Sequence, residues 1–224
     1  LALSDEILLK VDKAARYIGG EVNSVMKDKN EVEIRFAMCF PDVYEIGMSN
    51  LGMMILYNMF NQREDVWCER LFSPWPDLDK VMREEKIPLF ALESQEPIRD
   101  FDFLGITIGY EMCYTNILQV LDLSGIPLKS ADRGDDFPIV IGGGACAYNP
   151  EPLAPFFDLF YIGEGETVYD ALFDAYKANK KAGGSRKDFL LAAAKIPGIY
   201  VPSLYEVTYK EDGTIASFAP TVDD

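Results

Sequence analysis

Histidine is absent from the 224 residues of the chain. Histidine titrates near neutral pH, acts as a general base and is the commonest nitrogen ligand of protein-bound metals. Its absence excludes a Ser-His-Asp triad, a Cys-His dyad and every histidine-ligated metal site. Histidine-dependent catalysis and metal binding are therefore excluded, and we assign no catalytic residue and no metal ligand to this chain.

Cysteine is scarce, with single residues at positions 39, 68, 113 and 146. No Cys-x-x-Cys pair is present, which excludes the common spacings of zinc and iron–sulfur sites. Scattered single cysteines in an acidic chain are typical of reduced thiols in the cytosol, so we expect a cytoplasmic protein.

Basic residues and long apolar runs are also few. The chain has 21 Lys and Arg against 37 Asp and Glu, a net charge of -16, so it would repel a phosphate backbone and we expect no direct nucleic-acid binding. Its apolar runs, such as residues 139–141, are too short to span a bilayer, and no signal peptide or membrane partner is expected. Hydrophobic residues nevertheless make up 49% of the chain, enough for a full core.

Apolar patterns of two kinds alternate along the chain. Strands are predicted at 31–40, 67–72, 88–92, 103–109, 138–141 and 159–162, and helices at 49–60, 77–85, 114–123 and 166–180. Strands that alternate with helices form parallel βαβ units with right-handed crossovers. The predicted fold is α/β, a doubly wound, mostly parallel sheet of flavodoxin-like type.

The two ends of the chain differ from this middle part. Residues 1–30 are predicted as a helical lead-in, with a helix over 3–16 that Ser4 can cap, and residues 31–182 as the flavodoxin-like domain. Residues 183–224 are predicted as an extension with a short helix at 186–195 and strands at 199–202, 205–210 and 214–218. Glu211-Asp-Gly213 is the expected hairpin turn of this small antiparallel part.

Ligands of doubly wound sheets bind at the carboxyl ends of the strands, so the residues after each strand are candidates for a binding site. Gly47 would allow close backbone approach and Ser49 could cap the next helix, although an ordinary loop explains both. For the segment after residue 109, the alternative to a binding site is a structural role, in which Thr115 or Asn116 caps the next helix and the aromatic residues fill the core. The candidates after these two strands are Asp42, Tyr44, Gly47, Ser49, Tyr110, Glu111 and Cys113.

Two glycine-rich turns follow the later strands. Three glycines from Gly142 would let a flat ligand lie against the backbone. Ala147 stands where the third glycine of Gly-x-Gly-x-x-Gly would fall, which that pattern tolerates, but the turn lies too late in the chain for a dinucleotide site and no phosphate-loop lysine follows. In the second turn the acids could instead complement the dipole of the next helix. Cys113 and Cys146 could form a thiol pair, although filling of the core is the favoured explanation. The cofactor-binding candidates in these turns are Gly142, Gly143, Gly144, Gly163, Glu164, Gly165 and Glu166.

The order of these turns resembles a known family. Ile139-Val-Ile-Gly-Gly-Gly-Ala-Cys-Ala-Tyr-Asn-Pro-Glu-Pro-Leu153, followed by Asp158-Leu-Phe-Tyr-Ile-Gly-Glu-Gly-Glu166, is similar to the cobalamin-binding-like domain that precedes many radical-SAM cores. Residues 15–21, 40–49 and 197–205 resemble one uncharacterised radical-SAM subfamily of iron–sulfur oxidoreductases. The resemblance covers nearly the whole chain.

This resemblance implies an accessory N-terminal domain of a radical-SAM enzyme whose partner is its own C-terminal core. In the family a Cys-x-x-x-Cys-x-x-Cys motif in a following barrel holds the cluster, and this sequence lacks that motif. The 4Fe-4S cluster and SAM are therefore expected only in the downstream domain, and this chain is not expected to be catalytic alone.

The resemblance also raises cobalamin as a ligand. Domains that bind cobalamin through histidine carry Asp-x-His-x-x-Gly after the first strand, whereas this chain has Asp42-Val-Tyr-Glu-Ile-Gly47 with Tyr44 in the histidine place. A phenol is a poor substitute for imidazole as a cobalt ligand. Two alternatives follow: cobalamin binds without a protein ligand, its nucleotide tail entering between the first strand and the Gly142 turn, or the fold has kept its shape without the vitamin.

A functional alternative of another class is a cofactor-free structural or protein-interaction module. A flavin or nucleotide binder is disfavoured because no phosphate loop follows the first strand. The discriminating feature is the space behind the Gly142 turn. A cofactor domain needs an open slot there, and an interaction module would fill it with Phe, Tyr or Met side chains.

Overall fold

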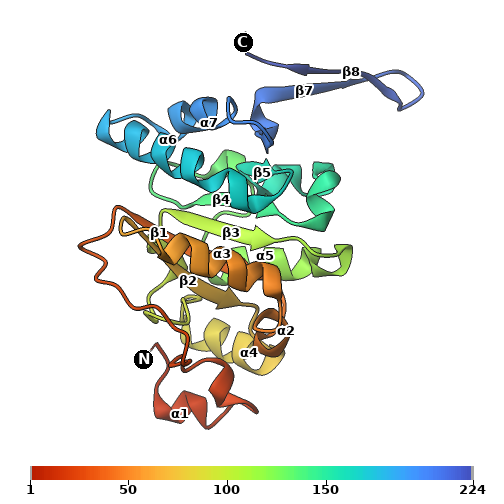
Figure 1. The fold of residues 1–224 in the computed structure, drawn as a ribbon. Coiled ribbons are helices and arrows are strands. Elements are labelled where there is room, and N and C mark those ends of the chain that lie inside the picture. Colours follow the sequence, from red (N-terminus) through yellow and green to blue (C-terminus); the bar gives the residue numbers. More distant parts are fainter. Residues whose placement is uncertain (1, 223–224) are drawn as a thin grey trace.

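The central sheet contains six strands in the order β2-β1-β3-β4-β5-β6 (Figure 1). The structure is a computed structural model that describes residues 2–222. β1 to β5 are parallel and β6 is antiparallel to β5, so the order of the first five is the flavodoxin-like 2-1-3-4-5. This confirms the predicted α/β, mostly parallel fold. The strands are β1 Ile34–Phe40, β2 Val66–Phe72, β3 Phe103–Thr107, β4 Ile139–Gly143, β5 Leu159–Tyr161 and β6 Ile199–Tyr200.

Helices cover both faces of the sheet (Figure 1). α3 (Leu51–Asn61), α6 (Tyr169–Lys181) and α7 (Arg186–Ala193) pack on one face, and α4 (Pro76–Glu85) and α5 (Tyr114–Leu123) on the other. Every residue of β1 and β2 is buried, as expected of strands covered on both sides. None of the helices in residues 2–222 is both long and apolar enough to cross a membrane.

Two predicted elements are wrong. The helix expected over 3–16 is reduced to α1 (Asp5–Leu8), which Ser4 caps as predicted, and a 3-10 turn at Ala14–Arg16. Leu3 and Val11 each pack separately into the hydrophobic core on one face of the sheet. Their spacing therefore reflects tertiary packing and not a continuous helix. The strand expected at 88–92 forms a single bridge, Phe90 to Pro97. Prolines at both ends of this loop lack the N–H that a ladder requires.

Side chains and loops cover much of the outer side of β2. The carbonyl of Val66 accepts a hydrogen bond from Lys27 Nζ at 2.6 Å. The Asn61 side chain bonds both the N–H and the carbonyl of Cys68, at 3.0 and 2.9 Å. The N–H of Arg70 donates to Glu93 at 2.6 Å, and its carbonyl accepts from Leu92 N at 2.8 Å. The lead-in and the loop over 88–97 therefore take the place of a further strand.

A buried ionic cluster holds the lead-in to this side of the sheet. The guanidinium of Arg70 is wholly buried and donates to Glu93 from Nε at 2.7 Å. Its other nitrogens donate to Asn23 at 3.1 Å and to Ser24 at 2.9 Å, both in the lead-in. The Tyr57 ring of α3 lies 4.5 Å from the guanidinium carbon. Arg70 thus joins β2, α3, the lead-in and the 88–97 loop.

Asp65, just before β2, provides a pH-dependent link to α6. It pairs with Arg63 at 2.8 Å and with Lys177 of α6, and these cations, Arg63 first, lower its pKa below the ordinary 3.8. A lowered carboxyl pKa stabilises the fold above the ordinary value, and this stabilisation is lost as the pH falls toward the folded-state pKa. We expect Asp65→Asn to lower the free energy of unfolding by about 1 kcal/mol at pH 7, because the pair is partly exposed.

The measurement is urea unfolding of wild type and variant at several pH values. The difference should shrink below about pH 4, where the unfolded carboxylate becomes protonated. Asp174→Asn is a matched control, since Asp174 faces the same two cations but its side chain is 65% exposed, and it should cost less than about 0.5 kcal/mol. A cost for Asp65→Asn that stays constant from pH 7 to pH 2 would contradict this role.

The C-terminal part ends in a separate antiparallel hairpin, β7 (Tyr205–Tyr209) with β8 (Ile215–Pro220). The predicted hairpin turn at 211–213 is confirmed. In Figure 1 the hairpin projects beyond the body of the domain, in the direction in which the parallel strands point.

Candidate functional site

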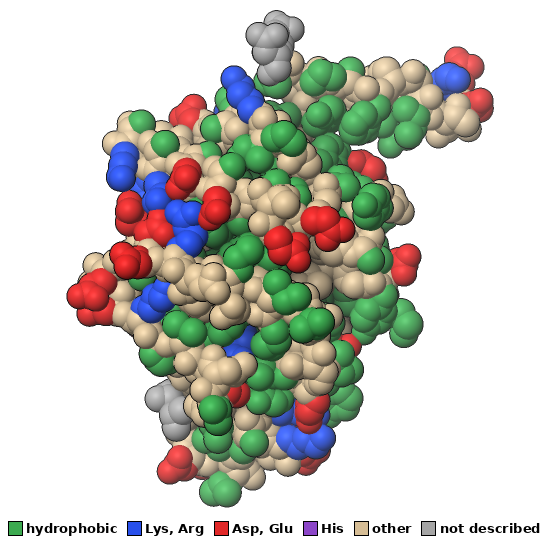
Figure 2. Space-filling model, viewed as in Figure 1, with side chains coloured by type: hydrophobic (Ala, Val, Ile, Leu, Met, Phe, Trp, Pro, Cys, Tyr) green, Lys and Arg blue, Asp and Glu red, His purple; other side chains and the backbone are tan. Residues whose placement is uncertain are grey.

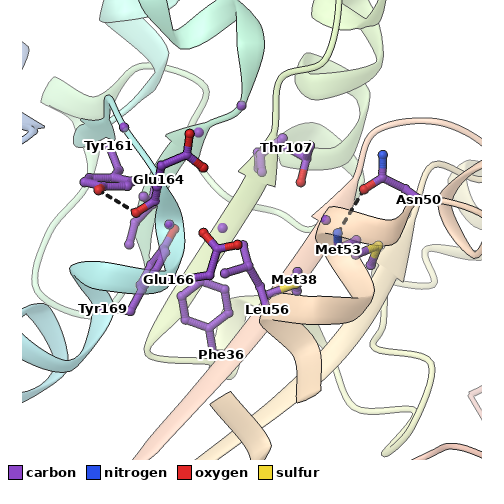
Figure 3. Close-up of a pocket in the computed structure, with 18 residues that line it drawn as sticks. Phe36, Met38, Asn50, Met53, Leu56, Thr107, Tyr161, Glu164, Glu166 and Tyr169 are labelled. Carbon is purple, nitrogen blue, oxygen red and sulfur yellow. Dashed lines mark hydrogen bonds between the residues drawn. The ribbon is translucent and has the colours of Figure 1, made fainter. Parts of the chain in front are cut away.

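A cavity of about 230 Å³ opens at the carboxyl ends of the parallel strands (Figure 3). It lies between α3 and the turn after β5, above the ends of β1, β3 and β4. The chain connections reverse between β1 and β3, and a ligand crevice at this switch point is typical of doubly wound sheets. We call this cavity the slot. Its lining residues are Phe36, Met38, Asn50, Gly52, Met53, Leu56, Gly105, Ile106, Thr107, Ile141, Gly143, Gly144, Tyr161, Gly163, Glu164, Gly165, Glu166 and Tyr169.

The glycines of the slot have different roles. A Cβ on Gly105 would lie 2.4 Å from the Phe36 ring, so this glycine makes room for the aromatic floor. A Cβ on Gly142 would collide with Phe160 at 2.6 Å, so that glycine packs against β5. A Cβ on Gly143 would meet nothing closer than the Tyr161 carbonyl oxygen at 4.0 Å. At Gly143, therefore, bare backbone faces open space, and a ligand could approach it closely.

Two carboxylates stand beside the slot on the turn after β5. Figure 3 shows Glu164 and Glu166 on one side and Asn50 on the other. The turn is fixed by Gly163, whose φ of +149° favours glycine, and by the Tyr161 hydroxyl, which donates to the Glu164 carbonyl at 2.7 Å. Among the described residues that line the slot there is no Lys or Arg. The slot is thus suited to a neutral or cationic group and disfavours a bare phosphate.

Six predicted site residues line the slot: Gly143, Gly144, Gly163, Glu164, Gly165 and Glu166. Sequence reasoning missed the wall formed by α3, with Asn50, Gly52, Met53 and Leu56. The only signal for this wall was a glycine at the start of a predicted helix. Ser49 does not cap α3, because Asn50 accepts the Met53 N–H at 2.9 Å, and the Ser49 hydroxyl donates to the Glu45 carbonyl.

The other candidates after β1 do not line the slot. Tyr44 points toward the lead-in, where its hydroxyl donates to Glu21 at 3.1 Å, and its ring packs edge-on against Phe72. A Cβ on Gly47 would collide with the same Phe72 ring at 2.2 Å. Asp42 accepts a hydrogen bond from Tyr110 at 2.7 Å, and burial and Glu21 raise the pKa of the Tyr44 phenol. Tyr44 is thus engaged away from the slot.

The candidate site residues after β3 differ in their exposure to solvent. Glu111 is exposed in a 3-10 turn, whereas Cys113 is buried next to it. Neither Thr115 nor Asn116 caps α5, and Asn116 donates to the Pro41 carbonyl at 2.9 Å. Within residues 2–222, no three His, Cys, Asp or Glu side chains are grouped so that they could hold a metal ion.

The cysteines should differ sharply in reactivity. Cys146 is partly exposed, whereas the other three are buried, and burial raises the pKa of Cys113 and Cys146. We expect iodoacetamide at pH 8 to modify Cys146 slowly and to leave the others intact in the native protein, because only an accessible thiolate reacts. Mass spectrometry of the modified peptides measures this, with Cys146→Ser as the unreactive control. Rapid modification of Cys113 would contradict the burial described here.

Several exposed apolar side chains lie on the loops and helix ends that follow β1, β3 and β4. Met112 is 84% exposed and Tyr148 78% exposed, although both are apolar or aromatic. Figure 2 shows hydrophobic side chains gathered on the side toward which the strand arrows of Figure 1 point. Exposed apolar residues that share one side of a domain indicate a candidate binding surface. We call this surface the rim, and its residues are Ile46, Leu51, Tyr110, Met112 and Tyr148.

The fold and the slot define a flavodoxin-like domain with a candidate cofactor site at its switch point. Residues 52–202 match the family described as radical SAM proteins, N-terminal, and the chain belongs to this family. The chain is also 26% identical over 131 residues to an uncharacterised protein, MJ0966, of Methanocaldococcus jannaschii. That match covers 58% of this chain and 24% of the relative, so the chain spans about a quarter of that protein.

Proposed function

We propose that this N-terminal domain serves a radical-SAM core by binding cobalamin, with the nucleotide tail in the slot and no protein ligand to cobalt. The observation that carries the proposal is the open slot at the switch point, where the backbone of Gly143 is bare. An apolar floor with an uncovered glycine wall suits a flat heterocycle, which gains most from burial of its faces.

The residues present fit such a group. Phe36 and Met38 would lie beneath a flat base, Gly143 and Gly52 would leave room beside it, and the amide of Asn50 could donate a hydrogen bond. The apolar rim would cover part of a macrocycle at the mouth. Bound cobalamin would supply a cobalt centre able to carry a methyl group or an electron. This chain's residues would bind and orient the tail and keep water from its base.

The position of Tyr44 supports binding without a protein ligand. Its hydroxyl is bonded to Glu21, and a phenol is in any case a poor cobalt ligand. The acids at the slot support a neutral base in preference to flavin mononucleotide or a dinucleotide, whose phosphates would face Glu164 and Glu166. A tail phosphate would have to remain outside, toward solvent.

The test is gel filtration of the protein with hydroxocobalamin, followed by a visible spectrum of the protein peak. We expect a co-eluting corrin band of the base-off form, since a tail held in the slot cannot coordinate cobalt. Flavin mononucleotide at the same concentration is the control and should not co-elute. If no corrin co-elutes at high micromolar concentration, the alternative holds, and the rim serves a cofactor-free interaction module.

A further inference from the structure

The β7–β8 hairpin has two chemically different faces. Its pairing places Val207 opposite Phe218 and Tyr209 opposite Ile215 on one face. The other face is polar, and there the hydroxyls of Thr208 and Ser217 are 2.6 Å apart. The hairpin is therefore amphipathic, as expected of strands that have a core on one side only. We call the first face the apolar face; its residues are Tyr205, Val207, Tyr209, Ile215, Phe218 and Pro220.

The apolar face is largely uncovered in residues 2–222. Tyr209 is 65% exposed and Ile215 58% exposed, near the tip. Only the base is anchored, where Tyr205 stacks on Phe218 at 5.0 Å and lies 5.3 Å from Tyr200 of β6. An isolated two-stranded hairpin is marginally stable in water unless its apolar side is covered. We therefore expect another surface to cover the apolar face in the full-length protein.

The position of the hairpin indicates which partner. Family similarity ends at residue 202 and the hairpin begins at Tyr205, so it follows directly on the N-terminal domain. The relative is about four times longer than the stretch that matches, so further protein accompanies this domain there. In Figure 2 the hairpin projects past the carboxyl side of the sheet, and hydrophobic side chains line its lower side, toward the open space beside the body of the domain.

We infer that the apolar face of the hairpin docks on the radical-SAM core of the same protein, so that the core sits between the hairpin and the rim. The hairpin acts as a clamp that holds the core against the side of the domain where the slot opens. This inference rests on the family assignment and on the geometry of the hairpin. It does not depend on cobalamin, so the core can dock here even if the slot proves to bind nothing.

The experiment is site-specific photo-cross-linking in the full-length protein, without cobalamin. p-Benzoylphenylalanine replaces Tyr209 on the apolar face or, as the matched control, Thr208 on the polar face of the same strand. After irradiation, mass spectrometry identifies the peptides joined to each position. We expect position 209 to join peptides of the radical-SAM core, and this cross-link to be lost at position 208. Both substitutions lie on an exposed hairpin and leave the sheet untouched.

Three results would overturn the inference. Position 209 could join a second copy of the chain, seen as a covalent dimer, and the face would then be a dimer contact. It could join only residues within 2–222, and the hairpin would then fold back on its own domain. Equal joining of the core from positions 208 and 209 would show that the apolar face is not the docking side.

Discussion

Gly143→Leu should abolish corrin binding and leave the fold intact. Its isobutyl group would occupy the slot, because a Cβ at this position meets only the Tyr161 carbonyl oxygen, at 4.0 Å. The strand conformation of Gly143 is one that leucine also adopts, since its φ is not positive. A cavity of about 230 Å³ that receives a leucine side chain no longer admits a flat base. We expect the dissociation constant to rise about 100-fold or more, which corresponds to about 3 kcal/mol.

Absorbance titration with hydroxocobalamin measures this affinity, and urea unfolding checks the fold. Gly109→Leu is the matched control, since Gly109 follows β3 on the same side of the sheet, has open space and does not line the slot. It should bind corrin as the wild type does. Wild-type affinity of the Gly143 variant would show that corrin, if bound, lies elsewhere, and the slot would then lose its assigned role.

Glu93→Gln should be strongly destabilising for a conservative substitution. The glutamine keeps the shape of the side chain but removes the nearest counter-charge of the wholly buried Arg70 guanidinium, which keeps only Glu21, at 3.7 Å. The removal of one partner of a buried ion pair typically costs about 3–5 kcal/mol. Because glutamine can still accept the Arg70 N–H, we expect the low end of that range, about 3 kcal/mol, in urea unfolding.

Two further variants isolate the cause. Glu96→Gln removes a carboxylate from the same loop, but its side chain is 33% exposed beside Arg35, so it should cost less than about 1 kcal/mol. The double variant Arg70→Met with Glu93→Leu removes both charges and should recover part of the loss. A cost below about 1 kcal/mol for Glu93→Gln would show that water reaches Arg70 despite its burial.

The sheet could be predicted because its strands are covered on both faces. Full burial makes β1 apolar throughout residues 36–40, and such runs alternated with helical periods along the chain. The helix predicted over residues 3–16 was wrong because Leu3 and Val11 are buried by separate tertiary contacts at a spacing that resembles that of a helix. Periodicity records which residues are buried and does not record what buries them.

The site could be predicted only in part. The glycine turns after β4 and β5 were identified because glycine in such a place has few other uses. The α3 wall was missed because it meets the Gly163–Glu166 turn across the sheet, through folding of segments distant in sequence. A match to a motif likewise does not reveal where a side chain points. Tyr44 points toward Glu21 because the lead-in brings that carboxylate within hydrogen-bonding distance.

The covered outer side of β2 has a consequence for the behaviour of the protein at high concentration. An open strand at the border of a sheet is a template on which another chain can add a strand, and so a route to aggregation. Lys27, Asn61, Glu93 and Leu92 occupy the outward groups of Val66, Cys68 and Arg70. At the opposite border β6 has only two residues, too few to template a partner. The central sheet therefore offers little open edge at either border on which another chain could add a strand.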